Sequence, residues 1–447
     1  MKFYILICFL VSMMIVTSGC IAKDGSGPTS NAEDKNSQSR QETNSKPYVV
    51  VAYIDSGINP YHVVFRRPNS TTSPLEMIYN YPQNTTAINL TFGNDYTSCF
   101  ENDYKRWQSL EKKKLYYIPG TCIVGAISFS QDYSFDLYEL PGLPILADSS
   151  PHGNYVASAV VENNPDVFLV VVECGSKDLK EGLDWCANQS WIDIVSLSFG
   201  FQGGVNIPYY VWQNVSESTL ANANSGKTVI SGAGNRDVPN WFGDVAGPPW
   251  VIAIGGSNNN TKGDAIVAAR MPEFVSDFTI SVAKTESIDE YCPVSGTSMS
   301  APSAAGVISR VLLDARQRLN YTFGIKNGYI IDIPENNIHI KNTDLRTCLN
   351  KTAIYWNTTA YNPRNHTIFD DPPMTLVSLT APVLPVAPFL QMGWGYIGPE
   401  IVNETVDILL GKKEWTPSLE KQLAEPYMNA VYELRKQFWG NWPMSEK

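Results

Sequence analysis

A serine within a short motif of small residues is the strongest chemical feature of this sequence. Ser298 lies in Gly296-Thr297-Ser298-Met299-Ser300-Ala301-Pro302, between a glycine and an apolar run. Glycine permits a tight turn, and the residues that follow predict a helix. A serine in the first turn of a helix lies beside free backbone N–H groups and the positive end of the helix dipole. The motif therefore predicts a covalent nucleophile at Ser298, with an oxyanion stabilised next to it.

Such a nucleophile needs a base, an acid that orients the base, and a second oxyanion donor. Asp55 directly follows an apolar run, in Tyr53-Ile54-Asp55-Ser56-Gly57. His152, one of only four histidines, precedes a glycine in Pro151-His152-Gly153-Asn154, and Asn235 ends Gly232-Ala233-Gly234-Asn235. Each of these residues alone is commonly structural, as a turn residue or a buried histidine. Together they supply every group that acyl transfer by a serine requires.

The chain order Asp55, His152, Ser298 resembles that of the subtilisin-like serine peptidases, the subtilases. That family carries an Asp-Ser/Thr-Gly motif, a His-Gly motif, an Asn that closes a small-residue strand, and Gly-Thr-Ser-Met followed by Ala-Pro. All four occur here. The resemblance spans about residues 47–411, because Gly393-Trp394-Gly395-Tyr396 is similar to the segment that closes the family's domain.

The resemblance implies a serine endopeptidase acting on proteins or peptides. Ser298 would attack the scissile carbonyl, His152 would transfer the proton, and Asp55 would orient the imidazole. Asn235 and the Ser298 backbone N–H would form the oxyanion hole. Ser198-Phe199-Gly200 resembles the strand that pairs with the substrate backbone, although Phe199 also suits an ordinary core position. The chemistry requires no cofactor; the family often carries structural calcium, but no acidic loop here identifies metal ligands.

Two alternatives remain open. A sedolisin-like acid peptidase shares a similar serine motif but uses a Glu–Asp pair instead of histidine, which the motif His152-Gly153 disfavours. A catalytically silent lipoprotein with the subtilase fold would only bind its partners. It is disfavoured because all four chemical positions are filled.

The elements expected to position these residues form an α/β fold. Short β-branched runs at 48–54, 167–172, 192–197, 228–231 and 251–254 predict strands that are buried on both faces. The segments between them, such as 152–161 and 215–224, are long enough for helices. We therefore expect a doubly wound parallel sheet with helices on both faces. Asp55, Ser198 and Asn235 follow such runs, and active residues gather at the carboxyl ends of parallel strands.

The predicted domain organisation has four parts. A signal peptide covers 1–19, a lipid-anchor cysteine and polar linker cover 20–46, and the peptidase domain covers 47–411. An insertion at about 68–149, rich in Tyr, Asn and Pro, separates Asp55 from His152 more widely than is usual in the family. It would extend the substrate cleft or partly cover it. Residues 412–447 form a C-terminal extension that is helical by composition.

The N-terminus predicts export. Lys2 precedes an apolar run over 3–16 that is too short to span a bilayer comfortably and has the layout of a secretory signal. Small residues before Cys20 resemble a lipobox, so we expect lipidation of Cys20 and a membrane anchor, or else secretion. The polar residues that follow predict a flexible tether. They leave no room for a folded propeptide before Asp55, so we expect folding without one.

Charge and cysteine content complete the picture. The chain has 447 residues and a net charge of −11, and it lacks a basic cluster, which disfavours nucleic acid as a partner. Six cysteines follow Cys20, an even number that predicts disulfides in an exported chain. Of the 15 complete pairings we favour neighbours: Cys99–Cys122, Cys174–Cys186 and Cys292–Cys348. Zinc is disfavoured because no Cys-x-x-Cys or nearby histidine accompanies them.

Overall fold

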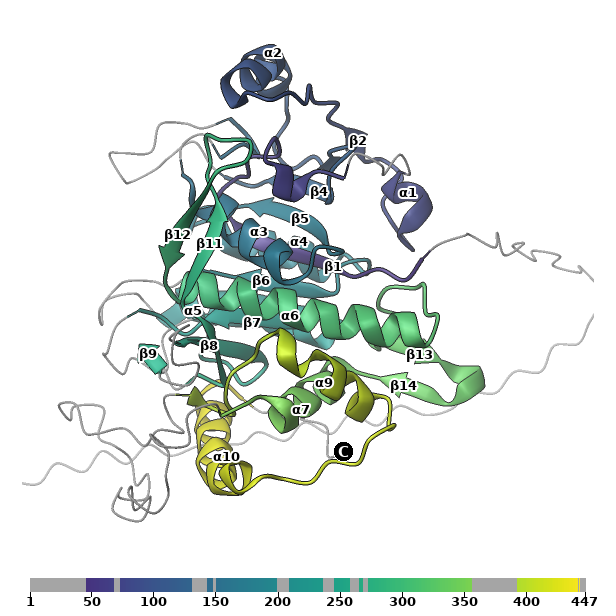
Figure 1. Ribbon diagram of the computed structural model, residues 1–447, viewed down its shortest axis with the longest axis vertical. Coiled ribbons are helices and arrows are strands. Elements are labelled where there is room, and N and C mark those ends of the chain that lie inside the picture. Colours follow the sequence, from purple (N-terminus) through teal and green to yellow (C-terminus); the bar gives the residue numbers. More distant parts are fainter. Residues whose placement is uncertain are drawn as a thin grey trace, which may run out of the picture. The chain divides into compact units, whose positions relative to one another are not determined.

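The predicted strands pair into one mostly parallel sheet of ten strands (Figure 1). The computed structural model describes residues 46–67, 73–130, 143–147, 150–198, 209–235, 245–257, 265–267, 272–355, 392–440 and 442. The strand order is β10-β8-β7-β6-β1-β5-β4-β3-β2, with β9 on the edge of β8. The strands are β1 (Val50–Asp55), β2 (Thr86–Ala87), β3 (Tyr116–Tyr117), β4 (Ile123–Ser128), β5 (Phe168–Glu173), β6 (Ile194–Leu197), β7 (Thr228–Gly232), β8 (Val251–Ser257), β9 (Ala265–Val267) and β10 (Phe274–Asp277).

The strand order reverses at β1. This strand pairs in parallel with β5 on one side and with β6 on the other, so that Val51 lies between Leu169 and Ile194. After β1 the chain runs to β2 at one edge, returns through β3, β4 and β5 to the side of β1, and then continues on the other side through β6, β7, β8 and β10. In an open α/β sheet, the crevice at such a reversal, beyond the carboxyl ends of the strands, is where ligands bind. Asp55, the last residue of β1, lies at that point.

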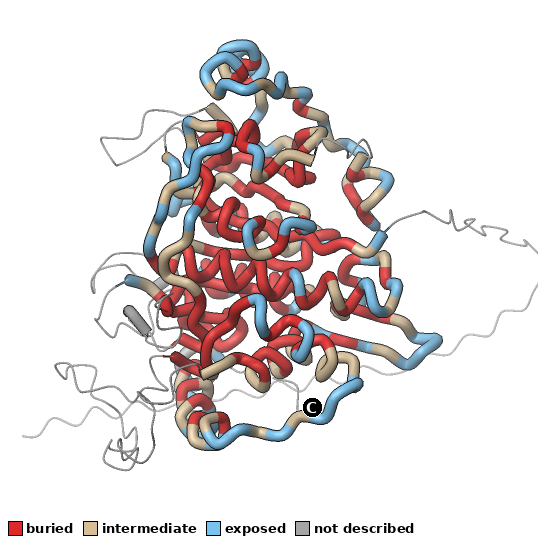
Figure 2. The backbone as a smooth tube through the Cα atoms, in the orientation of Figure 1, coloured by how far each residue is buried: buried red, intermediate tan, exposed pale blue. Residues whose placement is uncertain are grey.

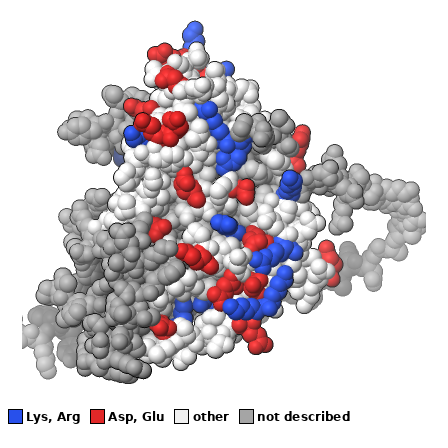
Figure 3. Space-filling view, viewed as in Figure 1, with Lys and Arg blue, Asp and Glu red and all other residues white. Residues whose placement is uncertain are grey.

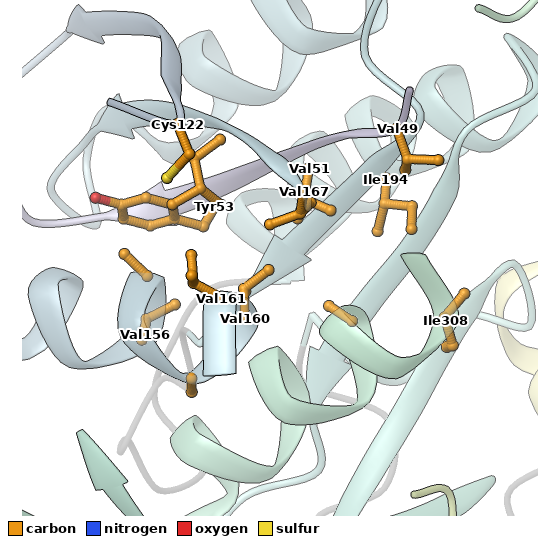
Figure 4. Close-up of a cluster of buried hydrophobic side chains, with 14 of the residues drawn as sticks. Val49, Val51, Tyr53, Cys122, Val156, Val160, Val161, Val167, Ile194 and Ile308 are labelled. Atoms are coloured by element: carbon orange, nitrogen blue, oxygen red, sulfur yellow. The ribbon is translucent and has the colours of Figure 1, made fainter. Parts of the chain in front are cut away.

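Helices cover both faces of the sheet, and β1 shows why. Its odd-numbered side chains, such as Val51 and Tyr53, pack with those of α3 (His152–Asn163) and α6 (Thr297–Arg318) (Figure 4). Its even-numbered side chains, such as Ala52 and Ile54, pack with those of α4 (Leu179–Ala187) and α5 (Tyr209–Asn224). All six residues of β1 are buried. The predicted doubly wound α/β fold is confirmed.

The stretch expected to be an insertion contributes β4 to the central sheet. All six residues of β4 are buried, and the strand pairs in parallel with β5. The same stretch holds the short helix α1 (Pro74–Met77) and α2 (Tyr96–Gln108). Gly125 and Ala126 interrupt the β-branched pattern of β4, which explains why the sequence did not distinguish this strand from its surroundings.

The remaining elements follow β10. The hairpin of β11 (Thr279–Ala283) and β12 (Tyr291–Ser295) leads into α6, and a second hairpin joins β13 (Ile331–Ile333) to β14 (Ile338–Ile340). The helical extension predicted over 412–447 contains α10 (Leu419–Trp439), and two further helices, α7 (Asn342–Thr352) and α9 (Val402–Leu409), precede it. Short 3₁₀ turns occupy Val63–Phe65, Pro334–Asn336 and Pro399–Ile401. Figure 2 shows the central strands of the sheet and α6 as the most continuously buried part of the chain.

The N-terminal predictions lie outside the described residues. These are the signal peptide over 1–19, Cys20 and nearly all of the linker to residue 46. Among the helices that the structure describes, none is both long and apolar enough to cross a membrane. On the face shown in Figure 3, acidic and basic side chains are interspersed. Among the surface ion pairs, Arg318 pairs with both Asp314 and Asp407.

The predicted disulfides are not formed. The six cysteines after Cys20 are all free thiols, so the pairings Cys99–Cys122, Cys174–Cys186 and Cys292–Cys348 are corrected. Five of the six thiols are buried and behave as small apolar side chains. Burial raises the pKa of Cys122 to about 11 and that of Cys186 to about 12. Packing, rather than covalent linkage, explains these cysteines.

A buried ion pair ties α6 to the start of the sheet. The side chains of Arg316 and Asp193 are both fully buried, and Arg316 Nη2 lies 2.6 Å from Asp193 Oδ1. Asp193 Oδ2 also accepts from the backbone N–H of Val50 at 2.9 Å. Arg316 Nη1 donates to the Tyr48 carbonyl at 2.7 Å, so the guanidinium and the carboxylate are both satisfied. The pair thus joins the C-terminal half of α6 to the first residues of β1.

Replacing Arg316 with Met should cost about 3–5 kcal/mol of unfolding free energy, because Asp193 would remain buried without its countercharge. Arg318→Met is the matched control on the same helix. Its pair with Asp314 is partly exposed, so its loss should cost less than about 1 kcal/mol. Urea unfolding midpoints at unchanged slope would measure both. Equal losses in the two variants would contradict the role given to the buried pair.

Candidate active site

The four residues predicted to carry the chemistry lie at strand ends and helix starts. Asp55 ends β1, Asn235 follows β7, His152 is the first residue of α3, and Ser298 is the second residue of α6. This is the carboxyl edge of the sheet, where the doubly wound topology predicts a site. The sequence placed these residues on the correct elements.

Asp55 and His152 are in direct contact. His152 Nδ1 lies 2.8 Å from Asp55 Oδ1 and 2.9 Å from Oδ2. The contact assigns the N–H of the neutral ring to Nδ1, so Nε2 is the atom that can accept a proton. The carboxylate is nearly buried, at 6% exposure, whereas the imidazole is 40% exposed. Asp55 is therefore enclosed by the protein, whereas His152 remains partly accessible from outside.

The same contact sets the protonation of His152. Partial burial disfavours the imidazolium, but the negative charge of Asp55 and its hydrogen bond together outweigh burial. The pKa of His152 is consequently raised above its ordinary value of 6.5. The Asp55 carboxylate therefore makes the imidazole a stronger base than a free histidine side chain.

Ser56 fixes α3 against the end of β1. The N-cap residue of α3, Pro151, makes no side-chain cap. Instead, Ser56 Oγ accepts from the Gly153 N–H at 2.8 Å and donates to the Ser150 carbonyl at 3.2 Å. A Cβ on residue 153 would lie 2.0 Å from the Ser56 carbonyl oxygen, so only glycine fits there. The residue after Asp55 thus caps the helix that carries His152.

Helix α3 is in turn joined to α6. Asn163 Nδ2 donates to Ser303 Oγ at 3.0 Å, and Asn164 Nδ2 donates to Ser309 Oγ at 2.8 Å. The helices also share the core on one face of the sheet. The position of His152 is therefore coupled to that of the helix that carries Ser298.

Asn235 is oriented by the residue before the nucleophile. Its Oδ1 accepts from the Thr297 N–H at 2.8 Å and from Thr297 Oγ1 at 3.0 Å. With the oxygen end fixed in this way, Nδ2 is the end of the amide that can donate to a ligand. Gly296, at φ 146°, makes the turn into α6 in a conformation that other residues rarely adopt. An amide donor and the first N–H groups of α6 thus lie close together.

Ser198 and Ser298 exchange hydrogen bonds. An α-helical carbonyl normally accepts from the N–H four residues later, but residue 302 is proline and has none. Ser198 Oγ donates to the Ser298 carbonyl instead, at 2.9 Å. In return, Ser298 Oγ donates to the Ser198 carbonyl at a long 3.4 Å. Pro302 thus leaves a carbonyl open at the nucleophile, and a neighbouring strand end satisfies it.

Two expected features are not brought together. Within the described part of the chain, His152 and Ser298 share no hydrogen bond, since the Ser298 hydroxyl faces Ser198. Catalytic hydrogen bonds are often long or unformed without substrate. Phe199 and Gly200 lie outside the described residues. In the same described ranges, no cluster of three or more His, Cys, Asp or Glu side chains could hold a metal ion.

No structural role was predicted for Ser56, Thr297 or Pro302, although all three lie within the motifs. Ser56 directly follows the catalytic-type Asp55, and an adjacent hydroxyl is a ready helix cap. Pro302 inside a helical run was the clearest missed signal, because it always leaves one carbonyl without its helical donor. The partner of that carbonyl could not be read from the sequence, since Ser198 is distant in the chain.

Comparison with known proteins agrees with this geometry. The model of the subtilase family, peptidase S8, matches residues 46–322, more than half of the chain and all four chemical positions. The chain belongs to the subtilase family. No curated protein sequence matches significantly.

Solved structures similar to this subtilase share little sequence with it. They include a lanthipeptide protease, at 13% identity and a TM-score of 0.44, covering 82% of this chain and 89% of that one. The protease domain of PatA, as an S218A mutant, is 14% identical with a TM-score of 0.44, and covers 83% of this chain and 98% of that one.

Replacing Ser198 with Ala should lower the unfolding free energy by about 1–3 kcal/mol, because the Ser298 carbonyl loses its donor. In a Pro302→Ala background the cost should be smaller, since residue 302 then has an N–H for that carbonyl. A double-mutant cycle by urea unfolding measures the coupling. Strictly additive losses would show that Ser198 and Pro302 do not act on the same carbonyl.

Proposed function

We propose that this subtilase is a serine endopeptidase that hydrolyses peptide bonds of protein substrates through Asp55, His152 and Ser298. The observation that carries the proposal is the Asp55–His152 contact at 2.8 Å, made by an imidazole that is 40% exposed. Family membership supports the same chemistry. The proposed reaction forms an acyl-enzyme on Ser298 and then hydrolyses it.

In the proposed mechanism, Ser298 Oγ turns from the Ser198 carbonyl toward His152 Nε2, which removes its proton as the hydroxyl attacks the scissile carbonyl. Asp55 stabilises the resulting imidazolium without itself taking the proton. The protonated His152 then gives its proton to the leaving amine. Water repeats the sequence on the acyl-enzyme and regenerates Ser298.

The oxyanion would be stabilised by two donors at the start of α6. The Asn235 amide has its oxygen held by Thr297, so its NH₂ group is available, and the Ser298 backbone N–H belongs to the first turn of the helix. Preorganised donors of this kind act without reorganisation as charge develops. We also propose that Ser198, Phe199 and Gly200 pair with the extended substrate backbone.

We further propose that the enzyme acts outside the cytoplasm. The support is the signal-like run before Cys20 and the lipobox-like residues that precede it. Lipidation of Cys20 would tether the enzyme to the outer face of the membrane through the polar linker, with secretion as the alternative. Labelling of intact cells with a membrane-impermeant fluorophosphonate tests the location: labelling only after cell lysis would contradict it.

Wild-type protein should react covalently with a fluorophosphonate probe, and Ser298→Ala should lose the label completely, because the probe needs the activated hydroxyl. Ser300→Ala is the matched control: its hydroxyl is buried in the same helix and bonded to the Gly296 carbonyl. Two results would contradict the proposed serine peptidase activity: folded wild-type protein that remains unlabelled, or Ser298→Ala protein that is still labelled.

The labelling rate of the wild type should rise with pH through a pKa above 6.5, because His152 must be neutral to act as the base. Asp55→Asn removes both effects that raise this pKa and leaves burial, which lowers it. The midpoint of the rise in labelling rate should then move below pH 6.5. The rate itself should fall by about 10⁴-fold, as for the same substitution in serine proteases.

Labelling rates at a series of pH values would measure both changes. A wild-type rate that is highest at strongly acid pH would instead favour the sedolisin-like alternative, in which a carboxylate serves as the base.

A further inference from the structure

A cavity of about 350 Å³ lies between α7 and α10, away from the catalytic edge. It borders Glu273, the residue before β10, and therefore lies at the amino end of that strand, whereas Asp55 lies at a carboxyl end. Figure 1 shows α7 and α10 together beneath the sheet. Its volume falls within the range of small-ligand pockets. The proposed peptidase chemistry does not use it.

The face of α10 that lines this cavity has an unusual composition. Lys421, Glu425, Met428, Tyr432 and Arg435 recur at alternating intervals of four and three, which places them on one side of the helix. A helix normally turns an apolar stripe toward the protein. Here the inward face carries two buried cations, since Lys421 is 5% exposed and Arg435 is 7% exposed.

Lys421 is a buried cation surrounded by groups that do not neutralise it. Its Nζ donates to the carbonyls of Asn350, at 2.8 Å, and Trp394, and lies over the rings of Tyr355 and Trp394. Among the described residues, no carboxylate lies within ion-pair distance of Nζ. Burial holds the pKa of Lys421 well below its ordinary value, so the charged form is costly in these surroundings. A bound anion would relieve this cost.

Basic side chains outnumber acidic ones in the lining. Four of them, Arg346, Lys351, Lys421 and Arg435, line the cavity together with two carboxylates, Glu273 and Glu425. Glu273 is already engaged by Arg346, which binds both of its oxygens, one of them at 2.7 Å. The cavity therefore favours an anionic ligand.

Two further features define that ligand. Trp394, Trp415, Met428 and Val431 supply apolar walls. The side-chain oxygen of Asn350 is buried without a hydrogen-bond partner among the described residues, and the carbonyl of the same residue accepts from Lys421. The lining thus includes an acceptor suited to an N–H, a basic group suited to an anion, and apolar walls.

We propose that this cavity binds the C-terminal residue of a peptide whose last side chain is apolar. The terminal carboxylate pairs with Lys421, the terminal backbone N–H donates to the Asn350 side-chain oxygen, and the side chain packs against the tryptophans. These three groups occur together at a peptide C-terminus, whereas a fatty acid lacks the N–H. Such ends are what the proposed peptidase would release, but the binding site does not depend on that activity.

The test uses the full-length Ser298→Ala protein, which cannot cleave the probe. Titration calorimetry compares acetyl-Ala-Phe with a free carboxylate, the same dipeptide as its C-terminal amide, and octanoate. The free acid should bind about ten- to a hundredfold more tightly than the amide, the worth of a hydrogen bond to a charged group. Because Ser298 is absent, failure of the peptidase proposal would not alter the result.

Lys421→Met should abolish the preference for the free acid while keeping most of the side-chain volume. Lys413→Met, which removes an exposed lysine paired with Glu404, should leave the preference intact. Equal binding of acid and amide to the Ser298→Ala protein would overturn the proposal, and this comparison stands even if Lys421→Met does not fold. Octanoate binding as tightly as the peptide acid would overturn the assignment to peptides.

Discussion

The close contact between the turn after β1 and the first turn of α3 is the constraint on which the rest of the site depends. Gly153 lies against the Ser56 backbone, Ser56 Oγ caps the helix, and His152 Nδ1 rests on Asp55. The helix is then joined to α6 by Asn163 and Asn164. Short polar contacts fix the position of α3 relative to β1 and that of α6 relative to α3. Each contact leaves little room for adjustment. Displacement of α3 would therefore disturb His152 and Ser298 together.

The nucleophile end of the site is built around a local violation of helix rules. Proline within α6 leaves the Ser298 carbonyl without a helical donor, and a second serine from a strand end supplies one. Local conflicts of this kind are expected at functional positions, where the sequence serves chemistry as well as stability. Thr297 also has two roles. Its N–H and its hydroxyl orient the Asn235 amide, and the same residue begins the helix.

The sequence predicted the parts of this protein that follow from periodicity and from compact motifs. Five buried strands and the elements that carry Asp55, His152, Asn235 and Ser298 could all be derived from it. The sequence did not predict the features that depend on contacts between residues far apart in the chain. The cysteine count predicted disulfides, but the thiols are free and mostly buried in the core. The strand β4 was hidden by a glycine and an alanine, and neither the Ser198–Ser298 exchange nor the Lys421 cavity follows from chain order.

The alternating burial of β1 has a consequence for assembly of the site. Odd-numbered side chains meet one pair of helices and even-numbered side chains meet the other, and both sets are fully enclosed. A slip of this strand by one residue would exchange the two sets, because side chains alternate with a period of two. The Asp55 carboxylate would then emerge on the side of the sheet away from α3. The Asp55–His152 contact thus requires the correct register of β1. A chain that pairs β1 one residue out of register can still form a sheet, but it cannot form this contact.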